Sequence, residues 1–599
     1  MTREKLASLP RVAGTRADKL LRAFLDATPV YEVCELLVPV GVDARVAGRT
    51  VDMLGKPAPR LLRDDPWSLL AVPGVTPADA DRVARSAIPG VTRDDPRRAR
   101  ALVAWVLARQ ARDGHTVDLR ERVADALAEF AAGDAVAAIG AALDAGTVVA
   151  VDDAEHGSLL ALSRYAHAED SIAQGVARLL VTAQPIAADL DSSPQSLDEA
   201  QRAAVEAALR SGVSVLTGGP GTGKSRTVAT LVQLSEAAGR QVALAAPTGR
   251  AAKRLEELCD APASTLHRLL GAQPRQSEDG VSFDAGFAHT DENPLEQDVV
   301  VVDETSMLDV ELADALLSAC ADGTHLLFVG DAAQLPSIGP GRVLGDLIDS
   351  GTLPVTELTT LYRQAEGGTI ARLATVVRGG SLVGVDDPDR EVVIVPARGS
   401  AEAAHRVVQL VTDSIPRALG IPAGQVQVVT PVHRGPAGTQ ALNTALKARL
   451  NPGQGGRRFD AGDRVVATAN HLEAEPFGYA NGEVGTVEEV DPDGTVTVLF
   501  ASGPAEVKGK ALADLLHGWA ITVHRAQGSE FPAVVVVLPP EAGRMMSRPL
   551  VYTALTRAQR HLSVVHAAGP AVARAVRHVG ALPRRTQLLP LLREYVQRS

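Results

Sequence analysis

The sequence predicts an α/β protein with two parallel-sheet domains, preceded by a helical N-terminal region. From residue 196 onward, short apolar runs alternate with helical stretches, which is typical of parallel sheets whose strands are joined by helices. One such run, Val213–Leu216, leads through a glycine-rich turn into a helix. The first 95 residues carry instead short helical patches punctuated by Pro and Gly. These three observations carry the prediction of fold class.

The totals indicate a multi-domain globular chain. Its 599 residues exceed one ordinary domain, and 46% hydrophobic with 22% charged residues are sufficient to form buried cores. Lys and Arg number 60 against 72 Asp and Glu, which gives a net charge of −12. That balance argues against a uniformly basic nucleic-acid binder, although a local positive channel would still suffice to hold nucleic acid.

Cysteine usage and hydropathy predict a cytoplasmic protein. Cys34, Cys259 and Cys320 lie far apart, which disfavours disulfides, zinc ribbons and four-cysteine iron–sulfur clusters. The N-terminus has no apolar signal core, and no apolar run approaches the ~18 residues of a membrane span. We therefore expect no membrane contact.

Residues 1–95 are expected to form a helix-hairpin-helix region. The segment Leu69–Ala84 predicts a helix, a tight turn and a second helix, and Leu9–Phe24 and Leu36–Leu54 look like degenerate copies. The turn consists of Pro73, Gly74 and Val75. Turn amides of such hairpins bind DNA phosphates without regard to sequence. The same pattern also suits an ordinary helical turn or a protein-packing unit, so these interpretations stay open.

Residues 96–190 predict a helical, winged-helix-like spacer. Helices are expected at Arg97–Arg112 and Leu119–Ala132, and strands near 147–151 and 158–162. The polar, proline-flanked stretch at 185–195 predicts a linker.

Two α/β domains are expected at 191–355 and 356–580, followed by a C-terminal tail at 581–599. The apolar runs that predict their strands are Val213–Leu216, Val242–Ala245, Val299–Val302, Leu326–Val329, Val392–Val395, Val426–Val429, Val534–Leu538 and Leu562–Val565. The turn-rich segment 271–294 predicts a β-hairpin insertion in the first domain. Segment 456–515, with Asn-Gly and Asp-Gly turns between alternating runs, predicts a small β-barrel insertion in the second.

The glycine-rich turn fits the phosphate-loop pattern G-x-x-x-x-G-K-[ST] in the strand–turn–helix context that it needs. Backbone amides of such a turn and the helix N-terminus bind phosphate oxygens, Lys224 reaches the outer phosphates, and Ser225 can bind Mg²⁺. The expected contacts to ATP are made by Gly218, Gly219, Pro220, Gly221, Thr222, Gly223, Lys224, Ser225 and Arg226.

Polar residues follow the next apolar runs, at the sheet edge where ligands bind in open parallel sheets. We assign Asp303 to the metal that bridges the phosphates, and Glu304 to the attacking water. Asp331 and Gln334 follow the fourth run, where Gln334 can sense a terminal phosphate.

Arginine and glutamine side chains complete the expected nucleotide site. Arg363 and Arg557 are candidates for stabilising charge on the transferred phosphate. Gln201, shortly before the phosphate loop, is placed to read an adenine edge.

The ordered motifs GGPGTGKS, APTGRAA, VVVDETSM, GDAAQLP, LYRQ, ITVHRAQGSEF and YTALTRA resemble those of superfamily 1 helicases of the RecD type. The hairpin-bearing N-terminus and the expected barrel look like the stand-alone RecD-like members in particular. The motif-bearing resemblance covers roughly 197–565. It implies two RecA-like motor domains, with Arg363 and Arg557 projecting from the second onto the γ-phosphate held by the first, and with Glu530 contacting the ribose.

The resemblance also implies how DNA is bound. The positions that match residues along single-stranded DNA are Pro247, Thr248, His267, Thr430, Pro431, Thr522, His524 and Gln527. The insertion at 271–294 matches the pin that splits the strands, and the implied direction is 5′→3′. Arg525 stands where the family often has lysine, and we expect it to keep the function.

Three functions follow from these expectations. The first is a monomeric ATP-driven helicase that acts on single-stranded DNA and duplex junctions in repair and recombination, with other repair proteins as potential partners. The second is the motor subunit of a multi-subunit exonuclease V. The third is a DNA-binding ATPase switch that separates no strands.

Overall fold

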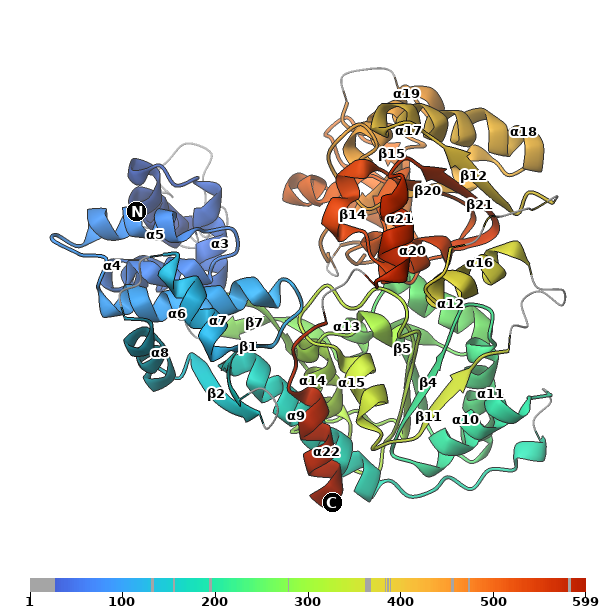
Figure 1. The fold of residues 1–599 in the computed structure, drawn as a ribbon, viewed down its shortest axis with the longest axis horizontal. Helices are drawn as coiled ribbons and strands as arrows, with labels where there is room; N and C mark the ends of the chain where they lie inside the picture. The colour runs from blue at the N-terminus through green and yellow to red at the C-terminus, as the bar shows by residue number, and fades with distance from the viewer. Residues whose placement is uncertain are drawn as a thin grey trace, which may run out of the picture. The chain divides into compact units, whose positions relative to one another are not determined.

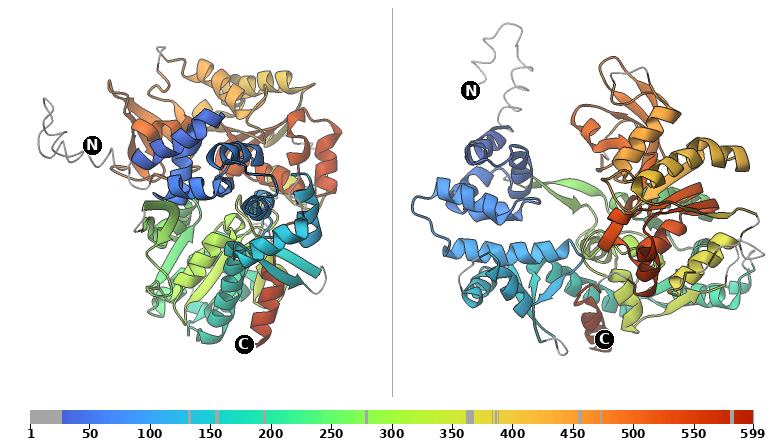
Figure 2. Two further views of the ribbon diagram at one scale, coloured as in Figure 1. Left: turned by 90° about the vertical axis from the view of Figure 1, so that its left-hand side faces the viewer. Right: turned by 45° about the horizontal axis from the view of Figure 1, so that its top comes forward.

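The computed structural model describes residues 27–130, 134–153, 157–192, 196–277, 280–360, 368–382, 384, 387, 389–453, 457–471, 474–579 and 583–598. It divides into two compact units (Figures 1 and 2). The first comprises Met1–Glu169, Gly271–Ala288 and Arg584–Gln587, and the second Asp170–Leu270, His289–Pro583 and Leu588–Ser599. The expected hairpin copy at Leu9–Phe24 lies outside the described residues.

The N-terminal part of the first unit repeats one local pattern. A short 3₁₀ helix leads into a turn with a left-handed glycine, then a buried valine, then an α-helix. Gly41 and Val42 occupy these positions in the first copy, and Gly74 and Val75 in the second. The elements are η1 (Val38–Val40), α3 (Arg45–Leu54), α4 (Ala58–Asp64), η2 (Pro66–Ala71) and α5 (Pro77–Ala87). The predicted hairpins at Leu36–Leu54 and Leu69–Ala84 therefore share this pattern; η1 continues a helix at 27–37, whereas η2 follows α4.

The rest of the first unit has the helix–strand–helix–helix–strand–strand order of a winged helix. These elements are α6 (Pro96–Ala111), β1 (Val117–Leu119), α7 (Arg120–Ala128), α8 (Ala135–Asp144), β2 (Val148–Asp153) and β3 (Gly157–Leu162). The strands form an antiparallel sheet in the order β1-β3-β2. The predicted hairpin insertion is a two-stranded antiparallel ribbon of β7 (Ala272–Ser277) and β8 (Gly280–Phe287), and it packs against α3.

The second unit begins with a six-stranded parallel sheet in the order β11-β4-β10-β9-β5-β6. Its strands are β4 (Val213–Gly218), β5 (Val242–Ala246), β6 (Ala263–Thr265), β9 (Val299–Val302), β10 (His325–Gly330) and β11 (Val355–Leu358). The main helices around it are α10 (Glu199–Arg210), α11 (Lys224–Ala237), α12 (Gly249–Cys259), α14 (Val310–Ala319) and α15 (Val343–Ser350). Leu216, Val301 and Val329 share a buried core with α10, α11 and α12.

Two expectations are corrected, the end of the first motor domain at 355 and the C-terminal tail at 581–599. The edge strand β11 extends the first sheet to Leu358, three residues past the expected end at 355, because it pairs in parallel with β4. The chain end is no free tail. It forms α22 (Leu588–Arg598), which packs against α15, and Arg593 donates to the Ser350 carbonyl at 3.2 Å.

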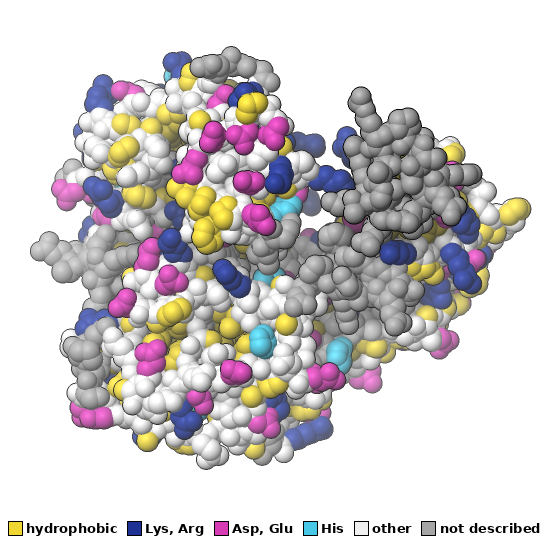
Figure 3. Space-filling view, turned by 180° about the vertical axis from the view of Figure 1, so that it is seen from behind, with side chains coloured by type: hydrophobic (Ala, Val, Ile, Leu, Met, Phe, Trp, Pro, Cys, Tyr) yellow, Lys and Arg dark blue, Asp and Glu magenta, His cyan; other side chains and the backbone are white. Residues whose placement is uncertain are grey.

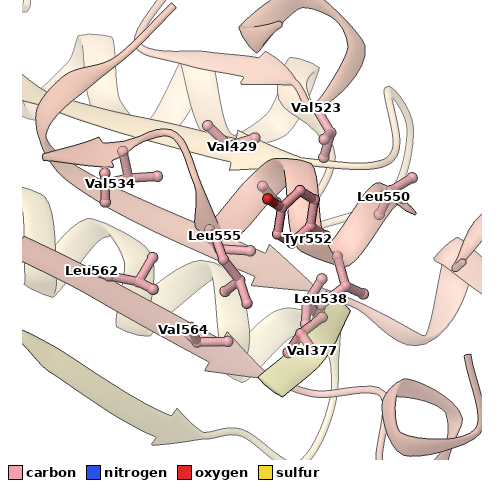
Figure 4. Close-up of a cluster of buried hydrophobic side chains, with 14 of the residues drawn as sticks. Val377, Val429, Val523, Val534, Leu538, Leu550, Tyr552, Leu555, Leu562 and Val564 are labelled. Carbon is pink, nitrogen blue, oxygen red and sulfur yellow. The ribbon is translucent and has the colours of Figure 1, made fainter. Parts of the chain in front are cut away.

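A second parallel sheet follows in the order β12-β21-β20-β13-β19. Its strands are β12 (Val392–Pro396), β13 (Val426–Thr430), β19 (Ala520–Thr522), β20 (Phe531–Leu538) and β21 (Ala558–His566), and its flanking helices are α16 (Thr369–Arg378), α17 (Ser400–Gln409), α18 (Ile415–Leu419), α19 (Thr439–Leu450), α20 (Arg548–Leu555) and α21 (Pro570–Arg577). Along β20, Val534 and Leu538 join the core with α16, α20 and α21 (Figure 4), while Val535 and Val537 face α17 and α19. This alternation explains the unbroken apolar run, because both faces of the strand are buried.

The segment predicted as a barrel folds as a five-stranded antiparallel sheet in the order β17-β16-β15-β14-β18. Its strands are β14 (Arg464–Ala467), β15 (Val484–Val490), β16 (Val496–Phe500), β17 (Gly503–Val507) and β18 (Leu515–His517). We call it the inserted sheet. On the face drawn in Figure 3, acidic and basic side chains are interspersed, so the net negative charge is not gathered there into one field. Among the described helices, none has the length and apolarity to cross a bilayer.

Candidate functional site

The phosphate loop joins β4 to α11 in a cradle shaped by glycines. Gly221 and Gly223 take φ values of 78° and 89°, which non-glycine residues rarely adopt. A Cβ at Gly218 would lie 2.7 Å from both the Leu358 carbonyl oxygen and the Thr222 hydroxyl. The Lys224 ammonium lies over the loop and donates to the carbonyls of Gly218 and Gly219 at 2.6 and 3.0 Å. The sequence motif therefore folds as the glycine-shaped strand–turn–helix that its pattern predicts.

The two predicted carboxylates follow β9 at the carboxyl edge of the sheet. Glu304 has a φ of 53°, in the left-handed region that is strained for residues other than glycine, and this turns the chain sharply after Asp303. Burial raises the pKa of Asp303, against the nearby charge of Lys224. Burial and the charge of Asp303 raise the pKa of Glu304, against the charges of Arg557, Lys224 and Arg254.

Close packing fixes the adjacent strand end. The Thr305 hydroxyl donates to the Val329 carbonyl at 2.8 Å. A Cβ at Gly330 would lie 2.7 Å from that hydroxyl and 2.9 Å from a Leu344 methyl group, so only glycine fits the start of GDAAQLP.

Arg557 reaches this edge from the second motor domain. It is 2% exposed, and its guanidinium donates to Gln334 Oε1 at 3.0 Å, to the Ser529 carbonyl at 3.2 Å and to the Thr553 carbonyl at 3.0 Å. The structure thus brings the predicted residues Gln334 and Arg557 together across the two motor domains. Arg363 lies outside the described residues.

A tyrosine that the sequence reading did not single out makes a second bridge between the motor domains. Tyr552 projects from α20 (Figure 4) and donates to Asp331 Oδ2 at 2.7 Å. Its hydroxyl also lies 3.2 Å from where a Cβ on Gly219 would be. Burial, and then the charge of Asp331, raise the pKa of Tyr552 far above its usual value. Tyr552 therefore donates as a neutral phenol.

Gln201 lies buried in the first turn of α10. It is 1% exposed and occupies the third position of α10, where its Oε1 accepts from the Asp198 backbone N–H at 3.2 Å. Its Nε2 is buried and has no hydrogen-bond partner among the described residues. A buried unpaired donor is costly unless a ligand satisfies it.

Most of the predicted nucleotide residues line one cavity of about 280 Å³ between the motor domains, but Gln201, Gly218, Gly219 and Thr222 are not part of its lining. Its lining includes Gly223, Lys224, Ser225, Arg226, Asp303, Glu304, Gln334, Glu530 and Arg557. Arg254, which the sequence reading missed, also lines it and forms an ion pair of 2.6 Å with Glu530. Its signal was a helical face, since Ala251, Arg254 and Leu258 recur at spacings of three and four along α12 and all line the cavity.

The residues predicted to contact DNA lie at the carboxyl ends of paired strands in both motor sheets. Pro247 and Thr248 follow β5, and His267 follows its parallel neighbour β6. In the second sheet, Thr430 ends β13 directly opposite Thr522, which ends β19. Two distant pairs of motifs are thus adjacent in space.

Four of these residues are buried, unlike the DNA-facing positions that were expected: Thr430, Pro431, Thr522 and Gln527. The three polar ones bond within the protein. Thr430 donates to the Ala437 carbonyl at 2.9 Å, Thr522 accepts from the Arg525 N–H at 3.3 Å, and Gln527 donates to the Leu335 carbonyl at 2.8 Å.

The side chains left accessible at this edge of the second sheet are His433, Arg434, His524 and Arg525. Burial and the charge of Arg525 lower the pKa of His433, and burial and His433 lower the pKa of His524. Sequence reasoning named His524 as a contact and expected Arg525 to keep the function of the family's lysine, but it did not single out His433 and Arg434, which lie just after the motif positions Thr430 and Pro431.

The predicted hairpin turn in the first unit is partly exposed. Pro73 and Gly74 face solvent, whereas Val75 is a buried core residue. The Pro73 carbonyl accepts from Arg49 at 3.2 Å, and the Val75 carbonyl accepts from the Trp105 indole at 3.2 Å. The turn is therefore braced by its own unit, and it presents Pro73 and Gly74 outward.

Three family models match separate parts of the chain. An "ATP-dependent RecD2 DNA helicase HHH domain" matches residues 26–117, an "AAA domain" matches 196–390, and a "UvrD-like helicase C-terminal domain" matches 517–565. The first range covers the repeat of short helices and continues to β1, the second covers the first motor domain, and the third covers β19, β20 and nearly all of β21 in the second sheet.

Curated relatives extend the match over almost the whole chain. The ATP-dependent RecD2 DNA helicase of Deinococcus radiodurans is 33% identical over 579 residues, which cover 93% of this chain and 77% of that protein. The RecBCD enzyme subunit RecD of Mycobacterium tuberculosis is 36% identical over 464 residues, covering 68% of this chain and 76% of that one. Among solved structures, a Pif1 helicase from Candida albicans is similar at 18% identity and a TM-score of 0.40, covering 68% of this chain and all of that one. The chain belongs to the RecD2 family of ATP-dependent DNA helicases.

Proposed function

We propose that this chain hydrolyses ATP in the cavity between its two motor domains and converts the cycle into 5′→3′ movement along single-stranded DNA. The observation that carries the proposal is the origin of the cavity's lining. Lys224, Asp303 and Glu304 come from the first motor domain, and Arg557 and Glu530 from the second. A nucleotide held by both domains favours their closed arrangement, and its cleavage weakens that preference.

The donor set suits a magnesium nucleotide. The phosphate cradle, the unpaired Gln201 amide and the carboxylates at the sheet edge fit phosphates, a base edge and a metal, respectively. Ser225 and Asp303 would hold Mg²⁺, which would neutralise charge on the phosphates. Glu304 would orient the attacking water, and Gln334 would report the state of the terminal phosphate to Arg557.

The DNA path follows from the paired strand ends. We propose that the strand runs over Pro247, Thr248 and His267 on the first sheet. On the second sheet His524 joins the accessible residues at the ends of β13 and β19, namely His433, Arg434 and Arg525. Thr430, Pro431, Thr522 and Gln527 are buried and support this edge from within the protein.

Strand separation is assigned to the β7–β8 ribbon, because a two-stranded hairpin can divide a duplex. The turn at Pro73 and Gly74 would hold a duplex or the displaced strand by its phosphates, since accessible turn amides suit such contacts. Work as an independent enzyme is favoured by the match of the first unit to the RecD2-type N-terminal model. The similarity to RecD subunits supports the alternative function as a motor subunit.

Strand displacement by the purified chain on duplexes with a 5′ or a 3′ tail tests this function. We expect ATP-dependent unwinding of the 5′-tailed duplex only, and none with Lys224→Ala. Unwinding of only the 3′-tailed duplex would refute the direction. DNA-stimulated ATPase without any unwinding would favour the motor subunit or the switch.

A further inference from the structure

Arg254 occupies an unusual place in the nucleotide cavity. It projects from α12 of the first motor domain, and its guanidinium lies 2.6 Å from Glu530 Oε1, a residue of the second. The Glu530 side chain is 8% exposed and that of Arg254 is 33% exposed, so the arginine keeps an open side within the cavity that Lys224 and Ser225 also line.

The residues around Arg254 place it close to where the phosphates of a bound nucleotide would lie. The charges of Asp303 and Glu304 both act on it, in addition to that of Glu530. Those two carboxylates stand beside the phosphate loop, at the end of the cavity where the terminal phosphate of a bound triphosphate must lie. A guanidinium binds phosphate with paired, charge-assisted hydrogen bonds, which are stronger than a single contact to a carboxylate.

The neighbouring Lys253 shows that the cavity does not simply attract every basic side chain of α12. Lys253 precedes Arg254 but points elsewhere, and its ammonium donates to the Ala501 carbonyl of the inserted sheet at 3.1 Å. Two adjacent cations on α12 thus serve different neighbours, and only Arg254 lines the nucleotide cavity.

We propose that Arg254 is a further γ-phosphate-binding residue of the motor, which exchanges its ion pair with Glu530 for the terminal phosphate of ATP and so distinguishes ATP from ADP. The inference rests on the proposed nucleotide site and deepens it. In this exchange the Glu530 carboxylate loses its ion pair with Arg254 when the terminal phosphate is engaged, while its backbone carbonyl still accepts from Arg250 at 3.4 Å. The same event therefore binds the phosphate and breaks one bridge between the domains.

The test is nucleotide discrimination by the full chain, measured without DNA. Fluorescence titrations in the presence of Mg²⁺ measure the Kd of ADP and the Kd of a non-hydrolysable ATP analogue. The proteins compared are wild type, Arg254→Gln, Arg254→Lys, Glu530→Gln and the control Lys253→Ala. One lost charge-assisted contact corresponds to about a ten- to hundredfold weaker binding. We expect Arg254→Gln to weaken the analogue by that factor and ADP by less than about threefold, and Arg254→Lys to recover part of the loss. Lys253→Ala should match wild type.

A purely structural role predicts a different outcome. If Arg254 serves only to pair Glu530, then Arg254→Gln and Glu530→Gln should weaken both nucleotides alike, and that result would overturn the inference. Thermal unfolding of each variant identifies any loss of fold, and Arg254→Lys keeps the test valid if the glutamine variant unfolds. Failure of the wild-type chain to bind either nucleotide would instead refute the proposed site itself.

Discussion

Replacing Tyr552 with phenylalanine removes one hydroxyl from the contact between the motor domains. Tyr552 and Asp331 are both buried, and the hydroxyl donates to one carboxylate oxygen at 2.7 Å while the Ala333 N–H donates to the other at 3.0 Å. The ring would keep its packing in the core of the second motor domain (Figure 4). The substitution therefore isolates a single hydrogen bond to a buried charge.

The magnitude follows from the chemistry of that bond. A hydrogen bond to a charged group contributes about 1.5–3 kcal/mol, and leaving the buried carboxylate oxygen unpaired incurs a desolvation cost of similar size. Because the bond joins the two motor domains, the loss falls on their closed arrangement, which is the arrangement that binds ATP from both sides. We expect kcat/KM for DNA-stimulated ATP hydrolysis to fall about ten- to hundredfold.

A steady-state ATPase assay at saturating single-stranded DNA measures this effect. Tyr165→Phe is the matched control, because Tyr165 is also buried but its hydroxyl pairs with Arg164 inside the first unit. A double-mutant cycle with Asp331→Asn separates the direct bond from general loosening. If Tyr552→Phe hydrolyses ATP with wild-type kcat/KM, the bridge does not support closure and the reasoning fails.

Three further predictions concern Lys224, the β7–β8 ribbon and Glu304. Lys224→Ala should abolish ATP hydrolysis while single-strand affinity stays within about threefold of wild type; persistence of wild-type turnover would show that the phosphate site lies elsewhere. Replacing residues 272–287 with a short glycine linker should spare DNA-stimulated hydrolysis but abolish unwinding, and intact unwinding would argue against the pin. Glu304→Gln should abolish hydrolysis yet raise the melting temperature at pH 7. The raised pKa of Glu304 means that the folded protein disfavours the ionised carboxylate. The protonated Glu304 therefore costs the fold nothing below the pKa that it has in the unfolded chain, and stability is lost as pH rises through the pKa that it has in the folded protein. The gain should vanish near pH 4, and calorimetry at both pH values checks the sign.

The sequence predicted the central strands well because their burial leaves a direct trace. Val299–Val302 coincides with β9, and the run at Val534–Leu538 lies within β20. Both strands are covered on two faces, so the apolar run and the strand have the same cause. The polar residues after each run were also placed correctly, because the carboxyl ends of parallel strands meet at one edge.

Edge elements were missed for the opposite reason. Val355–Leu358 and Ala520–Thr522 are short and carry no long apolar run, and each becomes a strand only by pairing with a distant neighbour. The burial of Gln527 and the partner of Arg254 were likewise hidden, since both depend on contacts between the two motor domains. Local sequence reports local burial, whereas these positions depend on which distant segment packs against them.

The segment 524–531 joins the two functional edges of the second motor domain. His524 stands at the proposed DNA edge, and six residues later Glu530 pairs with Arg254 in the nucleotide cavity. The next residue, Phe531, lies between two arginines: Arg250 of the first motor domain at 4.3 Å from the ring centre, and Arg464 of the inserted sheet at 5.6 Å. Burial, reinforced by Arg250, lowers the pKa of Arg464 to about 10.

We therefore expect a shift of Glu530 to affect its neighbours along the chain as well as the nucleotide cavity. Phe531 is the first residue of β20 and its ring contacts both arginines, so we expect movement of this strand end to act on Arg250 of the first motor domain and on Arg464 of the inserted sheet. Because His524 lies on the same short segment, binding at the DNA edge and binding of the terminal phosphate act on one mechanical element. If both proposed contacts form, coupling in this motor requires no long pathway through the core, since a few consecutive residues would carry them.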